Sequence, residues 1–339
     1  MKFFFVGDFR SNTGPGIANK AIRKGLSKYG NILYSDANNR FSRVLEMIVK
    51  IPQSDAVCFC SSSKANIIGM KIAEMFNKKS FYIMHGYLTF ESQVSNDNIT
   101  EKEIEKINRF ERYIFKTVDQ VYCVSEGFMS YMKVTEPEFR DKFDYNYNGL
   151  DIGKIRKNAE KRSSSKNLRQ IVSIGGGMKQ KSNLAVCAAI NKLNKERKMN
   201  LRYIVIGPPY TDKEEICSYD FVTYYDELPH ERVLDILAES YLYIQNSIFE
   251  TFGLALIEAL CSKCNLLVSN TVGALGVIGD LENDDLIFDQ NDTEEIARKI
   301  ENIYRVGNAS RLYSGLRTDM IDFDKAAKSL VEKMKARLT

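Results

Sequence analysis

The chain has 339 residues, of which 44% are hydrophobic and 27% charged, enough for two globular domains at roughly 100–200 residues each. The net charge of +4 comes without a dense stripe of Lys and Arg interleaved with aromatic residues, which argues against nucleic-acid binding. No apolar run approaches the roughly 18 residues of a transmembrane helix, and the run that opens the chain is too short for a signal peptide.

The first part of the chain alternates short apolar runs with helical patterns. The runs are nearly continuous in apolar residues, which predicts strands of a parallel sheet buried on both faces. They cover 3–7, 31–35, 56–61, 81–85, 120–125 and 145–149. Helices are expected between them, near 16–28, 40–50, 64–77, 101–117 and 127–134.

A basic, serine-rich stretch at 151–167 predicts a linker, after which the alternation restarts. Further strands are expected at 171–176, 202–207, 221–226, 241–246, 265–270 and 285–289. Helices are expected near 183–196, 230–239, 252–263 and 293–305, with a helical tail over about 311–338.

This repeated alternation of strands and helices predicts two doubly wound, Rossmann-like α/β domains. The expected boundaries are an N-terminal domain over 1–155, a C-terminal domain over 156–322 and a tail helix over 323–339. Ligands of such sheets bind at the carboxyl ends of the strands.

Charge and cysteine content give hints about the surroundings. Residues 1–150 hold 21 Lys and Arg against 17 Asp and Glu, so they carry the whole positive excess. The excess fits an anionic acceptor or an anionic membrane surface, and it equally fits a plain scatter of surface lysines. Seven cysteines, an odd number without an export signal, predict a reducing cytoplasmic location.

Two glutamates, Glu250 and Glu258, lie eight positions apart around an apolar stretch. If a helix begins near residue 252, Glu258 shares the buried face with Leu254 and Ile257. A buried carboxylate without a partner is costly, so Glu258 is expected to meet either a cationic side chain or the hydroxyl groups of a ligand. In the purely structural alternative, Glu258 pairs with an Arg or Lys and Glu250 complements the helix dipole.

Backbone amides of Thr251, Phe252 and Gly253 are expected at the N-terminus of this helix, which is a natural anion site. Carboxylates beside a cluster of amides suit a sugar nucleotide. The sequence ETFGLALIEAL (250–260) resembles the E-x7-E signature of the retaining glycosyltransferases of family 4, which have the GT-B fold of two domains facing a central cleft. Similar segments support the resemblance over nearly the whole chain: 121–128, 146–151, 228–250 and 264–278.

The resemblance implies roles for individual residues. Glu250 matches the glutamate that contacts donor-sugar hydroxyls, and Glu258 matches the one that binds the nucleotide ribose. His85, at the end of a predicted strand, matches a histidine that reaches the donor sugar, against the alternative of a structural histidine. Phe252, Gly253 and Leu254 match backbone donors near the sugar and diphosphate.

A glycine-rich turn, SIGGGMKQKSN (173–183), allows the backbone to approach phosphates closely. Lys181 matches the family's lysine that binds the leaving diphosphate; the structural alternative is a solvated helix start. Gly176 stands where the family has an arginine. Lys179 lies nearby, but a lysine lacks the guanidinium fork.

The loop GDFRSNTGPGIANKAI (7–22) offers Gly14 and Gly16 for a similar close approach, with Asn12 or Thr13 able to touch a ligand. His230 is predicted to cap a helix. Cys261 and Cys264 lack a second pair or a nearby histidine, so a zinc site is not expected. The Asp322-x-Asp324 pair is expected to cap the tail helix, and we expect neither a metal nor a cofactor, the nucleotide sugar being a substrate.

The predicted function is that of a metal-independent retaining glycosyltransferase. It would move a sugar from a UDP- or GDP-sugar to a glycan or lipid-linked acceptor, with the departing phosphate taking the acceptor proton. The absence of tryptophan and the abundance of Lys, Asn and Ile suggest a bacterial source and synthesis of surface polysaccharide or another glycoconjugate. The first alternative is a GT-B-fold nucleotide-sugar epimerase. The second is a degenerate, transferase-like partner subunit, and Gly176 favours this second alternative.

The stretch 109–116, RFERYIFK, mixes Arg and aromatic residues at helical spacing. Its pattern favours a helix packed on its own sheet. The alternative is peripheral contact of the N-terminal domain with the inner face of the membrane.

Overall fold

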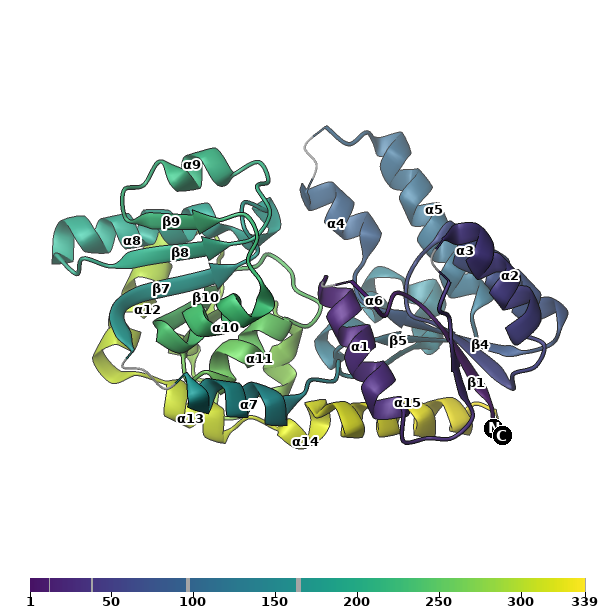
Figure 1. The fold of residues 1–339 in the computed structure, drawn as a ribbon. Helices are drawn as coiled ribbons and strands as arrows, with labels where there is room; N and C mark the ends of the chain where they lie inside the picture. The colour runs from purple at the N-terminus through teal and green to yellow at the C-terminus, as the bar shows by residue number, and fades with distance from the viewer. Residues whose placement is uncertain (12, 38, 96–97, 163–165, 339) are drawn as a thin grey trace. The chain divides into compact units, whose positions relative to one another are not determined.

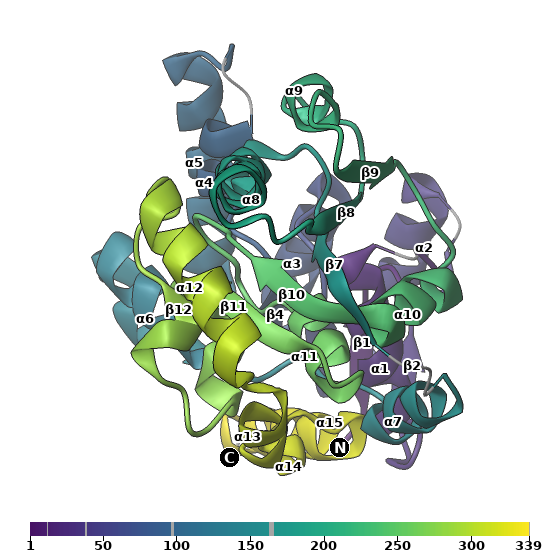
Figure 2. The same ribbon diagram turned by 90° about the vertical axis from the view of Figure 1, so that its left-hand side faces the viewer.

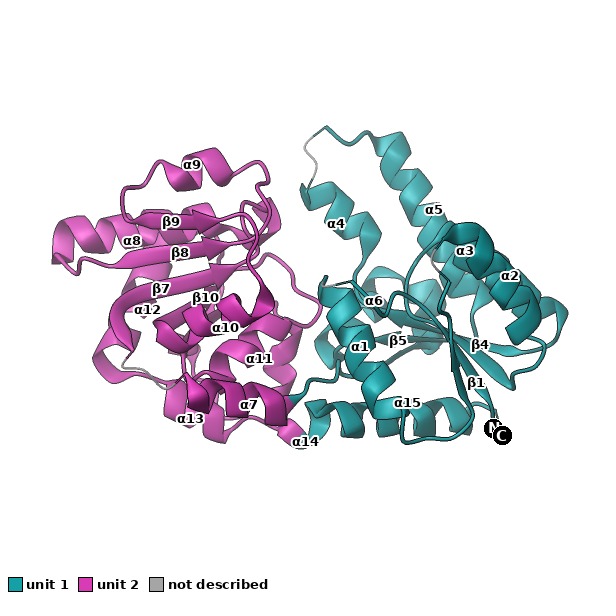
Figure 3. Cartoon of the chain, viewed as in Figure 1, with its two compact units in different colours: residues 1–151, 319–339 teal, residues 152–318 magenta. Residues whose placement is uncertain are grey.

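The computed structural model describes residues 1–339 except 12, 38, 96–97, 163–165 and 339 (Figure 1). The chain forms two compact units, one of residues 1–151 with 319–339 and the other of residues 152–318 (Figure 3). The boundary falls at Asp151, four residues before the expected position. The last 21 residues return to the first unit.

Within its described residues, unit 1 holds a six-stranded parallel sheet in the order β2-β1-β3-β4-β5-β6. The strands are β1 Phe3–Val6, β2 Ile32–Tyr34, β3 Ala56–Phe59, β4 Lys79–Met84, β5 Gln120–Cys123 and β6 Phe143–Tyr145. The order reverses at β1, and right-handed connections then place helices on both faces. The expected strands are confirmed except the last one, since β6 shares only Tyr145 with the predicted run 145–149.

The helices of unit 1 are α1 Gly14–Leu26, α2 Arg40–Lys50, α3 Lys64–Met75, α4 Leu88–Ser95, α5 Glu101–Thr117, α6 Glu126–Thr135 and α15 Phe323–Ala336, with a 3-10 helix at Pro137–Lys142. Four begin at the carboxyl edge of the sheet with a side-chain cap: Thr13, Asn39, Ser63 and Ser125 each accept a hydrogen bond from the amide three residues on. These caps fix where the loops at that edge end.

The stretch 109–116 lies in α5 and packs on its own sheet, as its pattern favours. Ile114 and Phe115 are fully buried, and the Phe115 ring contacts Phe139 and Phe143. Arg112 forms ion pairs with Glu136 and Glu138. The short helix α4, which precedes α5, is not among the predicted elements.

Within its described residues, unit 2 holds a second six-stranded parallel sheet, in the order β12-β11-β10-β7-β8-β9. The strands are β7 Asn167–Ile174, β8 Arg202–Ile206, β9 Val222–Tyr225, β10 Ser240–Gln245, β11 Asn265–Ser269 and β12 Leu286–Ile287. The fold class is therefore the expected one, α/β with two doubly wound sheets.

The helices of unit 2 include α8 Asn183–Arg197 and α12 Thr293–Val306, which pack together, and α10 His230–Glu239 and α11 Leu254–Cys261, which also pack together (Figure 2). Unit 2 also contains α7 Ile152–Lys161, α9 Lys213–Cys217 and α13 Ala309–Ser314. Among all described residues, no helix combines the length and apolar character needed to cross a membrane.

One prediction about the helices is wrong. The expected linker over 151–167 is largely α7, because Ile152 and Ile155 lie one turn apart and are buried while Lys154, Lys157 and Lys161 are exposed. Residues 163–165 of the expected linker lie outside the described part. The predicted tail helix over 323–339 is α15, and the helical tail before it consists of α13 and α14 (Thr318–Ile321).

The tail is held on unit 1 by backbone and side-chain contacts. The Leu150 amide donates to the Ile321 carbonyl at 2.7 Å, and the Phe323 amide donates to the Leu150 carbonyl at 3.0 Å. Helix α15 packs on α1 at Gly25, where an added Cβ would lie 2.4 Å from the Phe323 carbonyl oxygen. Only a glycine therefore permits this close approach of the two helices.

We predict that Gly25→Ala destabilises the protein, although alanine normally favours a helix over glycine by about 0.5–1 kcal/mol. The overpacking against α15 should dominate and lower the free energy of unfolding by about 1–3 kcal/mol. Gly30→Ala is the matched control, because a Cβ there meets nothing within 4 Å. Thermal melting of both variants checks this; a higher melting temperature for Gly25→Ala would contradict the close packing.

Candidate functional site

Two segments of unit 2 are tied together at the carboxyl edge of its sheet. The turn after β7 and the loop after β10 exchange three hydrogen bonds: Ile248 N to the Gln180 carbonyl at 2.8 Å, Gln180 Nε2 to the Phe249 carbonyl at 2.6 Å, and Asn246 Nδ2 to the Ser182 carbonyl at 3.1 Å. Strands β7 and β10 are neighbours in the sheet, so both segments leave the same edge. The ties align the flanking residues Lys181 and Glu250.

Lys181 and Glu250 form an ion pair between Nζ and Oε2. Both side chains are mostly enclosed, with 15% and 20% of their surface exposed. Gln245 donates from Nε2 to the same carboxylate oxygen at 3.3 Å, and its own Oε1 accepts from the Tyr243 hydroxyl at 3.1 Å. The structure thus brings the two predicted residues together and orients the carboxylate.

Gln245 was missed by sequence reasoning. The signal that could have found it is its place as a polar residue at the carboxyl end of a buried strand.

The glycines of the turn 175–177 have distinct packing roles. An added Cβ at Gly175, whose φ is +133°, would lie 2.6 Å from Lys181 Cγ. The absence of a side chain at Gly175 therefore leaves the space that the Lys181 side chain occupies. Gly176 has φ +61°, and a Cβ there would lie 2.4 Å from the Pro208 carbonyl oxygen. This backbone leaves no room for a side chain at 176. The arginine that the sequence resemblance implies at this position would therefore not fit this backbone.

The start of α11 differs from the expectation, because the helix begins at Leu254 and not at residue 252. Gly253 precedes it with φ 97° and supplies no side-chain cap. The carbonyls of Glu250 and Phe252 accept from the amides of Gly273 and Ala274 at 2.9 and 2.7 Å, which pins the segment before the helix. The first-turn amides and the helix dipole then favour an anion next to Thr251, Phe252, Gly253 and Leu254.

Glu258 lies on the inner face of α11 and is 6% exposed, as the helical spacing predicts. Its partner is a histidine: His230 Nε2 lies 2.7 Å from Glu258 Oε1. The prediction that His230 caps a helix is wrong, since no side-chain cap forms at the start of α10. The imidazole instead turns toward the carboxylate, and this hydrogen bond raises the pKa of His230.

In unit 1, His85 follows β4 and meets α1 through Asn19. Asn19 Nδ2 donates to the carbonyls of Asp8 and Cys60 at 3.0 and 3.3 Å, so its Oδ1 faces the His85 Nε2 at 2.9 Å. The amide orientation assigns the imidazole proton to Nε2. Burial lowers the pKa of His85 to about 4, so the ring is neutral at pH 7. Asn19 is another residue that sequence reasoning missed.

The other predicted loop residues of unit 1 serve the start of α1. A Cβ at Gly16 would lie 2.2 Å from Ser11 Oγ, and the Gly16 amide donates to Thr13 Oγ1 at 3.3 Å. Gly14 meets nothing within 4 Å of an added Cβ, so the space beside it is open. Asn12 lies outside the described residues. These residues belong to a different unit from Lys181, Glu250, Gly176 and Glu258.

Among the described residues, no group of three or more His, Cys, Asp or Glu side chains is arranged to hold a metal ion. Asp322 caps α15, with Oδ1 accepting from the Asp324 amide at 3.1 Å, as predicted. Cys261 and Cys264 are buried and form no disulfide; they lie at and just beyond the end of α11.

We predict that the His230–Glu258 pair makes stability depend on pH. Because the pKa of His230 is raised above its ordinary value of 6.5 in the folded protein, the contribution is fully present below about pH 6.5. It disappears as the pH rises through the folded-state value. The melting temperatures of wild type and Glu258→Gln should therefore converge as the pH rises above about 6.5, the ordinary pKa of histidine; a gap that stays constant with pH would contradict the ion pair.

We also predict that Gly176→Arg does not restore an arginine clamp. A left-handed backbone costs a non-glycine residue about 1–2 kcal/mol, and the contact with Pro208 adds to this. The variant should be less stable than wild type and bind nucleotide no more tightly. Lys179→Arg, three residues away in the same turn, serves as the control for an added guanidinium; tighter binding by Gly176→Arg in a calorimetric titration would refute the steric argument.

Residues 154–314 match the family described as Glycosyl transferases group 1, a range that contains Lys181, Glu250 and Glu258. A phosphatidylinositol N-acetylglucosaminyltransferase subunit of Arabidopsis thaliana is 29% identical over 160 residues, covering 40% of this chain and 35% of the relative. The GPI3 subunit of the same-named enzyme of Saccharomyces cerevisiae is 26% identical over 175 residues, covering 49% and 38%. The matches thus span little more than a third of these relatives.

Solved structures resemble the whole chain. Anabaena Alr3699/HepE in complex with UDP and glucose superposes with a TM-score of 0.69 at 12% identity, covering 99% of this chain and 100% of the other. Sucrose-phosphate synthase of Thermosynechococcus elongatus gives a TM-score of 0.74 at 12% identity, covering 99% of each. The chain therefore has the GT-B fold, and the segment that carries Lys181, Glu250 and Glu258 matches the group 1 glycosyltransferases.

Proposed function

We propose that this protein is a retaining glycosyltransferase that transfers a sugar from a nucleotide-sugar donor to a glycan or lipid-linked acceptor. The observation that carries the proposal is the meeting of Lys181, Glu250 and the start of α11 at one edge of the unit 2 sheet. This edge is where doubly wound sheets bind ligands. The group 1 family match over the same residues supports the transferase class.

The donor would bind through groups whose charges suit its parts. Lys181 and the first-turn amides of α11 supply positive charge for the diphosphate. Glu250, oriented by Gln245, would accept hydrogen bonds from hydroxyls of the donor sugar. Glu258 would accept the ribose hydroxyls while sharing its carboxylate with His230. These roles explain why carboxylates are retained in a largely apolar setting.

In the reaction, the acceptor hydroxyl would attack the anomeric carbon on the face from which the diphosphate leaves. The bond from that carbon to the phosphate oxygen breaks, and the departing diphosphate takes the hydroxyl proton. Lys181 would stabilise the negative charge that grows on the leaving group. His85, whose ring is neutral at pH 7, is suited to hydrogen-bond a sugar hydroxyl and not to act as an acid.

The donor is proposed to be a UDP-sugar or a GDP-sugar. The related fold of Anabaena Alr3699/HepE has been determined with UDP-glucose as well as with UDP, which favours uridine. Two relatives named for transfer to phosphatidylinositol favour a lipid-linked acceptor. We expect no metal in the reaction, because Lys181 and the first-turn amides of α11 would supply the positive charge that a divalent cation otherwise provides at the diphosphate. A cytoplasmic place beside the membrane and a bacterial glycoconjugate fit this acceptor.

The second candidate is a degenerate subunit that binds sugar nucleotide without turnover. Gly176 favours it, because the family's arginine is absent and its position has no room for a side chain. The two candidates differ in one measurable property: both bind nucleotide, and only the transferase releases UDP or GDP from the donor.

We predict that UDP or GDP raises the melting temperature of the wild type and not of Glu258→Ala, because a ligand of the native state stabilises it by mass action. Losing a hydrogen bond to a charged group costs about 1.5–3 kcal/mol, so affinity should fall at least about tenfold. Glu196→Ala, an exposed glutamate on α8, is the control. No shift with any nucleotide in the folded wild type would end the donor-site proposal.

We predict that Lys181→Ala lowers the rate of donor hydrolysis or transfer by about 10²–10³-fold, the loss typical of removing one group that stabilises developing negative charge. Nucleotide release from UDP- and GDP-sugars measures this, with exposed Lys195→Ala on α8 as the control. Nucleotide binding without release by the wild type, across donors and acceptors, would favour the binding subunit.

A further inference from the structure

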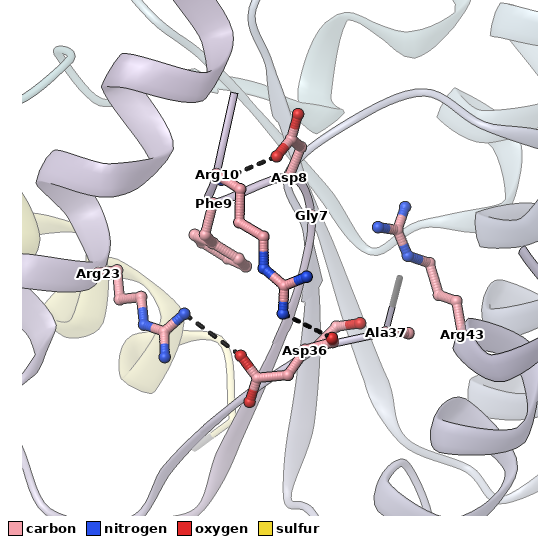
Figure 4. A pocket seen from close by; sticks show the side chains of 9 residues that line it. Gly7, Asp8, Phe9, Arg10, Arg23, Asp36, Ala37 and Arg43 are labelled. Atoms are coloured by element: carbon pink, nitrogen blue, oxygen red, sulfur yellow. Dashed lines mark hydrogen bonds and ion pairs between the residues drawn. The ribbon is translucent and has the colours of Figure 1, made fainter. Parts of the chain in front are cut away.

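A small pocket lies at the carboxyl ends of β1 and β2 in unit 1 (Figure 4). Its volume is about 30 Å³. A buried water needs roughly 10–15 Å³ on this scale, so the pocket admits a group the size of a few waters. It is too small for a sugar ring or a nucleobase. Its charged lining consists of Asp8, Arg10, Arg23, Asp36 and Arg43.

The two carboxylates of the lining are already engaged by the protein. Asp8 Oδ1 accepts from the amides of Arg10 and Ser11 at 2.9 and 3.1 Å, and the hydrogen bond from Arg10 lowers the pKa of Asp8. Asp36 Oδ1 pairs with Arg23 Nη1 at 3.4 Å. Both carboxylates therefore already have partners among the residues around the pocket.

Two arginines extend into the space between these walls. Arg10 Nη2 donates to the backbone carbonyl of Asp36 at 2.9 Å, which holds its guanidinium in place. Arg43, on α2, has a buried Nε for which the described part of the chain provides no hydrogen-bond partner. A buried N–H without an acceptor is rare and costly. In Figure 4 the guanidinium groups of Arg10 and Arg43 both extend toward the space beside Gly7 and Ala37.

We propose that this pocket is a subsite for one singly charged phosphate group, a phosphodiester, carried by the acceptor. Three arginines and two aspartates leave one net positive charge in the lining, which matches a monoanion. Guanidinium groups match phosphate oxygens in geometry, and the pocket holds one such group with the rest of the ligand outside. The acceptor assignment rests on the proposed transferase function; the anion site itself does not.

The helix that carries Arg43 also suggests the source of the phosphate. Phe41, Leu45 and Ile48 lie on one stripe of α2 and are 75%, 48% and 50% exposed, and the exposed, basic Arg40 begins the same helix. Apolar side chains beside basic ones suit the interface of an anionic bilayer. A lipid headgroup would then supply the phosphodiester, and a water-soluble phosphodiester is the other source of the same chemistry.

The test uses the full chain with arginine Nε labelled for NMR, and diethyl phosphate as the soluble probe. We expect diethyl phosphate to shift the Arg43 Nε–H signal in the wild type. The affinity should fall at least about tenfold in Arg10→Gln, as for other charge-assisted contacts. Arg40→Gln, exposed on the same helix and outside the pocket lining, should bind as the wild type does.

Vesicles distinguish the source. Cosedimentation with phosphatidylcholine containing 25 mol% phosphatidylglycerol, against phosphatidylcholine alone, should retain the wild type and Arg40→Gln more than Arg43→Gln. Phe41→Ser should cosediment less with the phosphatidylglycerol vesicles than the wild type does, while its affinity for diethyl phosphate stays unchanged. If the protein binds diethyl phosphate but not the vesicles, the phosphodiester subsite is supported and its ligand is a water-soluble acceptor.

Three results would overturn the proposal. The first is the absence of any Arg43-dependent binding in variants with wild-type melting temperatures. The second is a dianionic methyl phosphate binding more tightly than the diester. The third is UDP displacing the diester from Arg43, which would assign the pocket to the donor. Nucleotide binding to wild type and Glu258→Ala is measured separately. It tests the donor site without involving the arginines of the pocket, so failure of the phosphodiester subsite and failure of the donor site give different results.

Discussion

The candidate site depends on one constraint, the tie between the turn after β7 and the loop after β10. Gln180 and Asn246 make this tie with side-chain amides that bond to backbone carbonyls, so it does not depend on charge or pH. It places a lysine from one segment against a glutamate from the other. Two charged side chains in a mostly enclosed setting stabilise one another only with good geometry, and Gln245 supplies the missing orientation.

The turn after β7 has a glycine, Gly176, at the position where the sequence resemblance implies an arginine. A left-handed residue packed on a carbonyl at Gly176 excludes any side chain, so the positive charge at the turn comes from lysine. A lysine is a point charge and an arginine is a fork. We therefore expect the diphosphate to be bound with less directional control here, and with more reliance on the uncapped start of α11.

The two histidines of the chain have opposite electrostatic settings. Burial lowers the pKa of His85, and Asn19 fixes its proton on Nε2, so it is a neutral hydrogen-bonding group over the physiological range. The carboxylate of Glu258 raises the pKa of His230, so this ion pair is lost as the pH rises through that raised value. The expected pH dependence of stability thus arises in unit 2 and not at His85.

The sequence by itself determined the strands, the doubly wound pattern and the spacing that buries Glu258, because these follow from local periodicity and helix geometry. It also singled out Lys181 and Glu250. Only the tertiary structure decided their partners: His230 for Glu258, Gln245 for Glu250, Asn19 for His85, and the arginines around the small pocket. These contacts join segments that are distant in the sequence, and the order of the strands in each sheet is what brings those segments together. Helix α7 was likewise decided by packing, since the buried Ile152 and Ile155 outweighed a polar, linker-like composition.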